Sequence, residues 1–391
     1  MPVPVSRPRS RARPEVLGVL LVVGLLALVP WALGPFERGL LLRMLIWGLF
    51  ALSFDVVFGY AGLLSLGHSV YFGLGAYGAA WTLLALHSGA SPGAGAGAGT
   101  GLGVVLPLLA GLGLGGLIAI GLAPLLVRTG RHGFIIATAV TALIAFTLAQ
   151  SRRDLTGGDD GLTLPPLPLA LGGWRAGCAD PGPAYGLVLL LVAMTVALYG
   201  AIVRGPVGLA LRLVRENERR AEALGFDVLR VKALAFALGG AGAALAGALY
   251  ALTGCHVSTR VFHWLVSADA LIWTLFGGAG TLVGPLLGTA VFLALREGLS
   301  GLWPPGYPIL VGLALLLTVR AFPEGLLGLV LGLARGAARW AWPGRGGGKS
   351  RTAREVRDGM SDGDGTGEKR AAGRGGAQGV RRAAGRRPRR F

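Results

Sequence analysis

Three stretches of the sequence combine glycines with polar side chains in a way that suits binding of a small molecule. The first, Gly59–Tyr77, reads GYAGLLSLGHSVYFGLGAY. A regular helix has no need of so many glycines, whereas a broken helix uses them to turn backbone groups toward a cavity or ligand. Asp55 precedes the stretch by one turn, and an ionisable residue inside an apolar segment is a candidate for function. The predicted ligand-contacting residues are Asp55, Gly59, Tyr60, Gly62, Ser65, Gly67 and His68.

A second interpretation explains the same residues without a ligand. The glycines would form a seam along which helices pack closely, and backbone groups would satisfy Asp55 and His68. The sequence leaves both interpretations open.

The second stretch is Thr156–Leu162, TGGDDGL. Exposed amides beside glycines can bind a carboxylate, while Asp159 or Asp160 can meet an ammonium group. A plain surface turn is the alternative, and two carboxylates are too few for calcium, so no metal site is predicted. The candidate residues are Thr156, Gly157, Gly158 and Asp160.

The third stretch, Gly277–Gly288, reads GGAGTLVGPLLG and lies in the second half of the chain. Paired irregular segments in the two halves of a membrane chain point to a transporter's central site. Gly277, Gly278 and Gly280 are therefore added to the candidate residues, although the similarity between the two stretches is too weak to define a repeat.

The elements that must position these residues are membrane helices. The 391 residues are 53% hydrophobic and only 14% charged, with a mean hydropathy of +0.63. Soluble domains average about 25% charged residues. Long apolar runs predict an all-α, polytopic integral membrane protein of about ten transmembrane helices with glycine-broken segments. The expected spans are 16–33, 40–58, 69–86, 104–127, 132–150, 185–203, 233–252, 268–283, 285–299 and 307–319.

The net charge of +18 is concentrated at the two ends of the chain. An even number of spans places both ends on one side, and arginine-rich segments stay in the cytoplasm. We therefore expect a basic N-terminus over 1–15, a transmembrane domain over 16–335 and a basic, disordered cytoplasmic tail over 336–391. The tail has almost no aromatic residues to stack on bases, so a nucleic-acid partner is not expected.

Two outer loops, 151–183 and 253–266, hold Cys178 and Cys255. We expect unpaired thiols there, with a disulfide as the alternative.

One long charged run, Gly208–Lys232, interrupts the apolar segments. A charged side chain at the centre of a membrane helix costs about 2.5–3.5 kcal/mol on insertion scales, so the run must lie at the water surface. Its composition predicts a short helix that stops at Gly225. The predicted orientation places it, as the loop 204–232, in the cytoplasm.

The sequence contains none of the enzyme motifs HExxH and GxSxG, and it lacks the phosphate-binding GxxxxGK[ST] pattern. GGGKS at 346–350 lacks the required spacing. We therefore expect no catalytic residue, no cofactor and no ATP site on this chain, so that any ATP would be used by a partner.

Five ordered motifs make the chain resemble one family, the LivM-type permeases of branched-chain amino-acid ABC importers. Between Leu40 and Leu329, they are the three glycine-rich stretches, the charged run with the helix after it, and AFPEGLLGL at 321–329. The basic tail and the Gly/Ala-rich segment 91–103 have no counterpart in the family pattern.

The resemblance implies a multi-pass subunit of a bacterial inner membrane, with both termini cytoplasmic. Its implied partners are a LivH-like permease, two ABC ATPase subunits and a periplasmic binding protein. The glycine-rich stretches would line or gate the pathway, and the charged run would be the coupling loop that docks on the ATPase. The implied docking residues are Arg215, Glu216, Asn217, Glu218, Ala221, Ala223, Leu224 and Gly225.

Three alternatives remain at this point. Urea and short-amide ABC permeases look similar over the same segments. An ion-coupled secondary transporter would use intramembrane carboxylates such as Asp55, Asp269 and Glu297, but it has no need of an ATPase-docking helix. The third alternative is a membrane enzyme or scaffold, for which the sequence shows no site.

Overall fold

The computed structural model describes residues 33–88, 102–166 and 182–302, together with Leu28, residues 170–171 and 174–175, and some positions between 306 and 328. All of them belong to one compact unit, Met1–Gly336. Most of the predicted spans 16–33 and 307–319, the N-terminus 1–15 and the tail 336–391 lie outside the described residues.

The described part of the chain is helical because long apolar segments can satisfy their backbone groups in a membrane only within a helix or a closed barrel. Six helical stretches are long and apolar enough to span a membrane, and they confirm six predicted spans: Pro35–Tyr60, His68–His87, Gly103–Val127, His132–Ser151, Gly182–Arg204 and Val228–Gly254. This is an all-α, polytopic membrane protein.

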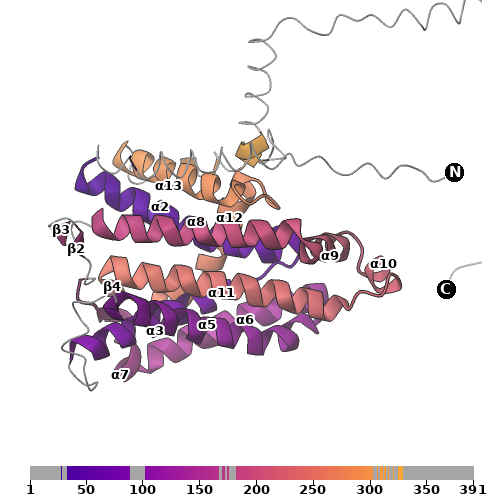
Figure 1. Cartoon of the computed structure of the whole chain (residues 1–391), viewed down its shortest axis with the longest axis horizontal. Helices are drawn as coiled ribbons and strands as arrows, with labels where there is room; N and C mark the ends of the chain where they lie inside the picture. The colour runs from indigo at the N-terminus through magenta and orange to yellow at the C-terminus, as the bar shows by residue number, and fades with distance from the viewer. Residues whose placement is uncertain are drawn as a thin grey trace, which may run out of the picture. The chain divides into compact units, whose positions relative to one another are not determined.

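These helices carry the labels of Figure 1, in which α8 and α11 run side by side, with α9 and α10 at one end and β4 at the other. The chain order of the helices is α2 (Pro35–Asp55), α3 (His68–His87), α5 (Leu102–Val127), α6 (Gly130–Ser151), α7 (Arg153–Thr156), α8 (Gly182–Arg204), α9 (Pro206–Glu216), α10 (Glu218–Ala223), α11 (Val228–Gly254), α12 (Trp264–Gly277) and α13 (Gly284–Leu302). Short π and 3-10 turns are η2 (Val56–Tyr60), η3 (Gly158–Asp160) and η4 (Thr259–Phe262).

Only two short strand pairs occur among the described residues. β1 (Leu162–Thr163) pairs with β4 (His256–Val257), and β2 (Ala170–Leu171) pairs with β3 (Trp174–Arg175), both antiparallel.

The core lies where α3, α5 and α11 pack against one another (Figure 1). Small residues allow this close approach, as is common between membrane helices. A Cβ atom added at Gly75 would lie 2.0 Å from the carbonyl oxygen of Ala244, and one at Gly247 would lie 1.9 Å from that of Phe72. The glycines in the later part of the first stretch therefore form the packing seam that the second interpretation expects.

Helical structure is interrupted in both of the places that the sequence predicted. Helix α2 continues into the π-helical turn η2, residues 61–67 are not helical, and α3 then begins at His68. Residues 278–283 likewise separate α12 from α13. Gly62, Gly278 and Gly280 have φ angles of 74°, 114° and 80°, which favour glycine.

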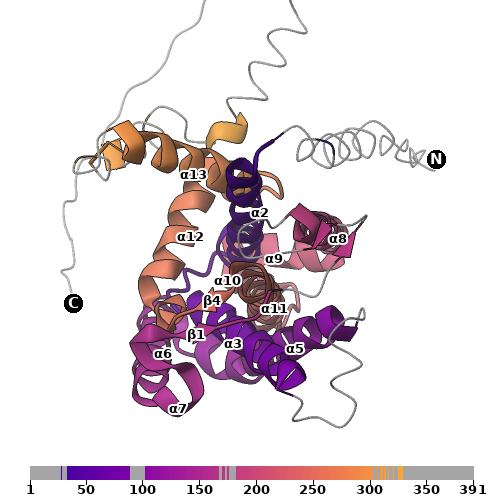
Figure 2. The ribbon, with the colours of Figure 1, turned by 90° about the vertical axis from the view of Figure 1, so that its left-hand side faces the viewer.

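The predicted span 268–283 has the wrong bounds, because the helix there, α12, ends at Gly277 and residues 278–283 are not helical. Helix α12 has 14 residues and is about 21 Å long, which is less than the hydrocarbon thickness of about 30 Å. It runs vertically in both Figure 1 and Figure 2, from α3 and α6 toward α2 and α13, at a steep angle to α8 and α11. Hydropathy reports that a segment is apolar but not the direction in which it runs.

The expectation of unpaired thiols is also wrong for Cys255, which is disulfide-bonded. The sequence contains one other cysteine, Cys178, which lies outside the described residues. Sequence separation carries no information on the distance between two loops.

Candidate functional site

Asp55 joins the two breaks. Its side chain is fully buried, and its Oδ1 accepts a hydrogen bond of 2.8 Å from the backbone amide of Gly280. The amide of Thr281 faces the same carboxylate. A carboxylate held by backbone amides can be stable in a buried position. The last turn of α2 and the loop between α12 and α13 therefore form one site.

Arg215 reaches this site from α9 in the charged run. Its guanidinium donates a hydrogen bond to the carbonyl oxygen of Gly59 and interacts electrostatically with Asp55. A Cβ atom added at Gly62 would lie 3.0 Å from the Arg215 Cγ, and one at Gly280 would lie 3.2 Å from its Nη1. One arginine of the charged run thus contacts both breaks.

A second contact joins α9 to the first break. The guanidinium carbon of Arg212 lies 5.9 Å from the centroid of the Tyr60 ring, within the range of a cation–π interaction. Four of the predicted residues therefore lie together around Asp55 and next to α9: Gly59, Tyr60, Gly62 and Gly280.

Glycine is required at the centre of this site. A Cβ atom at Gly59 would lie 1.9 Å from Asp55 Oδ1 and 2.4 Å from the Gly280 nitrogen, and one at Gly277 would lie 1.8 Å from the carbonyl oxygen of Gly284. A larger residue at Gly59 would push the two breaks apart, and one at Gly277 would separate the end of α12 from the start of α13.

Further polar residues of the first stretch are buried deeper in the bundle. The Ser53 hydroxyl lies 3.1 Å from Nε2 of His68 and donates to the carbonyl oxygen of Phe50 at 2.7 Å. His68 and Ser65 are fully buried, and neither His68 Nδ1 nor the Ser65 hydroxyl has a hydrogen-bond partner among the described residues. Gly67 packs so closely that an added Cβ would lie 2.5 Å from the carbonyl oxygen of Thr138.

The TGGDDGL stretch lies elsewhere, as a cap at the opposite end of α3. The Tyr77 hydroxyl, from the middle of α3, donates to the carbonyl oxygen of Thr156 at 3.2 Å. Thr156 Oγ1 donates to the Ala149 carbonyl at 2.5 Å, and Asp159 accepts from the Gln150 side chain at 2.8 Å. Asp160 is exposed.

The glycines of this cap serve its backbone. Gly157, Gly158 and Gly161 all have positive φ angles, of 74°, 63° and 69°, and a Cβ atom at Gly161 would lie 2.3 Å from the Val257 carbonyl oxygen of β4. These local turns account for the glycine content. The structure does not bring this stretch to Asp55.

The charged run folds into most of α9, all of α10 and the first turn of α11, where the sequence predicted one short helix. Asn217 caps α10 by accepting from the Arg220 amide at 3.0 Å, and Asp227 caps α11 by accepting from the Arg230 amide at 3.0 Å. The predicted stop at Gly225 is confirmed: its φ angle is 87°, and the amides of Gly225 and Phe226 donate back into α10 at 2.9 and 3.1 Å. This is the Schellman pattern of a helix end.

An ion pair fixes α10 on α11. Lys232 Nζ lies 2.6 Å from Glu218 Oε2, and only 7% of the lysine side chain is exposed. Ala221 is buried beside Val214 and Val228. The predicted docking residues therefore include some that hold the loop together.

The outward side of α10 remains open. Leu224 is 63% exposed and Phe226 is 36% exposed. Charged or polar exposed residues flank them: Glu216, Asn217, Arg219, Arg220 and Glu222. We call this set of exposed residues, from Glu216 to Phe226, the loop surface. It has the apolar centre and polar rim that are typical of a protein–protein contact.

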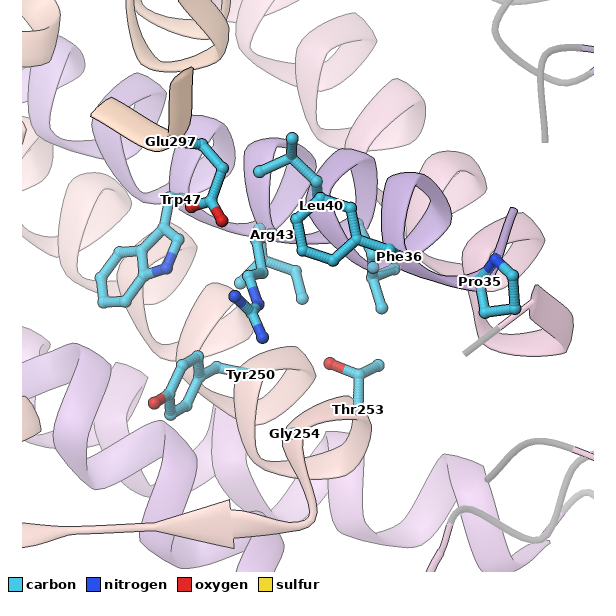
Figure 3. A pocket seen from close by; sticks show the side chains of 12 residues that line it. Pro35, Phe36, Leu40, Arg43, Trp47, Tyr250, Thr253, Gly254 and Glu297 are labelled. Carbon is cyan, nitrogen blue, oxygen red and sulfur yellow. The ribbon is translucent and has the colours of Figure 1, made fainter. Parts of the chain in front are cut away.

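A cavity of about 520 Å³ lies between α2, α11 and α13 (Figure 3). Its lining includes Arg43 and Glu297. Arg43 was not among the predicted site residues, although a single arginine inside the predicted span 40–58 was a usable signal.

A multi-pass helical bundle whose two broken segments meet at a buried carboxylate, in contact with a water-exposed charged loop, belongs to the class of membrane transport permeases. Residues 38–320 match the family described as the permease component of branched-chain amino acid transport systems. The chain belongs to this family, which confirms the resemblance drawn from its motifs.

Three curated relatives illustrate the match. The high-affinity branched-chain amino acid transport system permease protein LivM of Escherichia coli (strain K12) is 28% identical over 318 residues, 75% of this chain and 71% of that protein. The probable branched-chain amino acid transport permease protein LivM of Methanocaldococcus jannaschii is 27% identical over 329 residues, 74% and 93% of the two chains. The permease protein LivH of Escherichia coli (strain K12) is 26% identical over 303 residues, 72% and 91%. No solved structure matches the chain.

Proposed function

We propose that the chain is the membrane-spanning permease subunit of an ATP-driven ABC importer that moves branched-chain amino acids inward. The family and the names of the LivM relatives support the substrate class. The observation that carries the coupling mechanism is the hydrogen bond from Arg215, in the charged run, to the Gly59 carbonyl oxygen at the first break.

The mechanism follows from this contact. An ATPase subunit grips the loop surface and moves α9 and α10 when it binds and hydrolyses ATP. Arg215 passes that movement to Gly59, and the hydrogen bond between Gly280 and Asp55 passes it to the second break. Breaks with glycines at positive φ are positions where helices can reorient. Access to the pathway would change as the helices on either side tilt.

The partners are a LivH-like permease, two ATPase subunits and a periplasmic binding protein, and ATP is the cofactor of the ATPase subunits alone. The match to LivH supports a pair of related permeases, which would assemble around an approximate twofold axis. The lipid bilayer surrounds the pair.

The orientation rests on charge. Arginine-rich segments at 1–15 and 336–391 place both termini in the cytoplasm of a bacterial cell, together with the loop 204–232, and the chain lies in the inner membrane. The cap at Thr156–Gly161 would then face outward. Residues 16–335 form the permease domain.

The pathway residues are the buried polar groups of the first break and the glycines of the second. Ser65 and His68 have polar atoms without partners among the described residues, and such atoms are available to a passing ligand. The cap residues Thr156, Gly157, Gly158 and Asp160 would act only at the outer entrance.

Two other functions are less well supported. A urea or short-amide importer would share the coupling loop and differ in its ligand. An ion-coupled transporter would use Asp55 for an ion, but the Gly280 amide and Arg215 already engage that carboxylate.

The experiment tests docking on the loop surface. In the full-length chain, Leu224→Asp places a charge at the apolar centre of the surface without disturbing a packed contact. We expect capture of the ATPase subunits to fall by about tenfold or more, as at an interface hot spot.

Leu155→Asp is the matched control, because Leu155 is a similarly exposed leucine, at 52%, in the cap. It should leave capture unchanged. If Leu224→Asp also captures the ATPase subunits normally and transports at the normal rate, the docking assignment is wrong.

A further inference from the structure

The cavity of about 520 Å³ lies at the end of the bundle opposite to the charged run. Its walls come from the first turns of α2, the last turns of α11 and the second half of α13, and Figure 3 shows the lining side chains. Ligand sites in proteins occupy about 300–1,000 Å³. The cavity is therefore large enough for a molecule of amino-acid size.

Two opposite charges line this cavity. Figure 3 shows the Arg43 guanidinium, from α2, directed toward Tyr250, and the Glu297 carboxylate, from α13, above it. Arg43 also interacts electrostatically with Tyr250. Within the described part of the chain, neither Arg43 nor Glu297 has an ion-pair partner. Unpaired charges on apolar helices do not face lipid, so this cavity faces water or a ligand.

An aromatic wall adjoins the two charges. The Trp47 ring stacks on Phe72 with centroids 4.9 Å apart and lies 5.5 Å from the Tyr250 ring. Leu40 and Ile46 add aliphatic surface from the same helix, α2. The cavity thus combines one cation, one anion and a fixed apolar surface.

We infer that this cavity binds a zwitterionic amino acid with an apolar side chain before it crosses the membrane. Arg43 receives the carboxylate, Glu297 receives the ammonium group, and Trp47 with its aliphatic neighbours receives the side chain. This inference rests on the proposed function and deepens it, because paired charges discriminate for a zwitterion and against a neutral amide such as urea.

The cavity lies where a ligand would arrive from outside. Pro35 begins α2, Gly254 ends α11, and both lie at the end of the bundle that the proposed orientation assigns to the outer side. The Asp55 site lies toward the other end of α2, about 18 Å from Arg43 along the helix axis. The cavity is thus a binding site separate from the Asp55 site and closer to the outer side of the membrane.

The test is photo-labelling of the full-length chain in lipid nanodiscs. The probe is a leucine analogue that carries a diazirine in its side chain, and labelled peptides are mapped by mass spectrometry. We expect label on α2 near Trp47 and on α11 near Tyr250. An excess of leucine should remove the label, whereas leucinol, which lacks the carboxylate, 4-methylpentanoate, which lacks the ammonium group, and urea should not.

Two variants test the charges. Arg43→Met and Glu297→Gln should each weaken labelling by about tenfold or more, because each removes a charged hydrogen-bonding partner of the ligand. Arg38→Gln and Arg296→Gln are matched controls that remove a charge from the same two helices outside the cavity lining, and they should label normally.

Several results would overturn the inference. These are label that maps outside the cavity, competition by leucinol, 4-methylpentanoate or urea as strong as that by leucine, or normal labelling of both charge variants. Mapping on the unmodified chain needs no variant, so poor folding of a variant cannot hide the answer. Loss of all cavity label in the assembled transporter would show that a partner subunit fills the space, and would also overturn the inference.

The cavity assignment and the docking assignment can be contradicted separately. The label requires neither ATP nor an ATPase subunit. Cavity labelling together with normal ATPase capture by Leu224→Asp would therefore contradict the docking assignment alone. ATP-driven uptake without label in the cavity would contradict the cavity assignment alone.

Discussion

The backbone amide of Gly280 donates a hydrogen bond of 2.8 Å to Oδ1 of Asp55, although 225 positions separate the two residues. This bond links the end of α2 to the loop between α12 and α13. Because Asp55 is fully buried, the bond is shielded from water and the carboxylate depends on it. The two broken segments are thus linked to each other.

Removing the carboxylate should loosen this link. Asp55→Ala leaves the Gly280 amide without its acceptor, and we expect the free energy of unfolding to fall by about 1.5–3 kcal/mol. Asp55→Asn retains an oxygen acceptor and should lose less. Thermal unfolding of the purified protein in detergent measures both, with the exposed Asp160→Ala as control. Equal stability of Asp55→Ala and the unmodified protein would contradict the assignment.

A change at Arg215 should reduce transport without reducing ATPase docking. Arg215→Met removes the hydrogen bond to Gly59 but leaves the apolar centre of the loop surface unchanged. We therefore expect normal ATPase capture together with leucine uptake reduced by about tenfold, the effect of a lost charge-assisted hydrogen bond. Uptake by proteoliposomes containing the assembled transporter is the measurement.

Arg230→Met is the control for this change, since it removes the same charge from an exposed residue of the same charged run that lies outside the loop surface. If both variants transport equally well, Arg215 does not couple the loop to the break.

Gly59 should tolerate no side chain. In Gly59→Ala, the new Cβ would lie 1.9 Å from Asp55 Oδ1 and 2.4 Å from the Gly280 nitrogen, so the two breaks must separate. We expect a lower yield of folded protein and a lower unfolding temperature. Gly113→Ala, in α5 with no atom within 4 Å of the new Cβ, should be neutral or gain up to about 1 kcal/mol from helix propensity. Size-exclusion profiles and thermal unfolding distinguish the two, and similar behaviour would refute the predicted clash.

The Glu218–Lys232 ion pair should hold α10 in place. Glu218→Gln leaves the lysine, with only 7% of its side chain exposed, without its carboxylate. We expect faster hydrogen exchange in α10, corresponding to about 1–3 kcal/mol. The double variant Glu218→Gln/Lys232→Met should recover part of this loss, because no buried charge is left unpaired.

The pair of Arg230 and Asp227 provides the comparison, since their side chains are 88% and 48% exposed. Such a pair contributes less than about 1 kcal/mol. In Arg230→Gln, the rate of amide hydrogen exchange in α10 should therefore stay close to that of the unmodified protein. A rate increase as large as that of Glu218→Gln would argue against a special role for the buried pair.

Local features were predictable from the sequence. Apolar runs of about 20 residues indicated the spans, because hydrophobic transfer depends on composition within one segment. The charged run had to leave the membrane, and Gly225 had to end its helix. Both glycine breaks were predicted for the same reason, since glycine acts on its own backbone.

Contacts between distant segments were not predictable from the sequence. TGGDDGL was grouped with the two breaks, yet its glycines serve a cap near Tyr77. The apolar content of α12 suggested a span, but the helix runs across the bundle. Arg43 and Glu297, on α2 and α13, line one cavity although 254 positions separate them in sequence.

The sequence by itself determined that this is a helical membrane protein with two broken helices and a water-exposed charged loop, because each of these depends on neighbouring residues. The tertiary structure decided that Asp55 binds Gly280, that Arg215 reaches Gly59 from the loop, and that two opposite charges share a cavity. These relationships depend on how the helices pack, and packing is set by the fit of whole surfaces rather than by any local pattern.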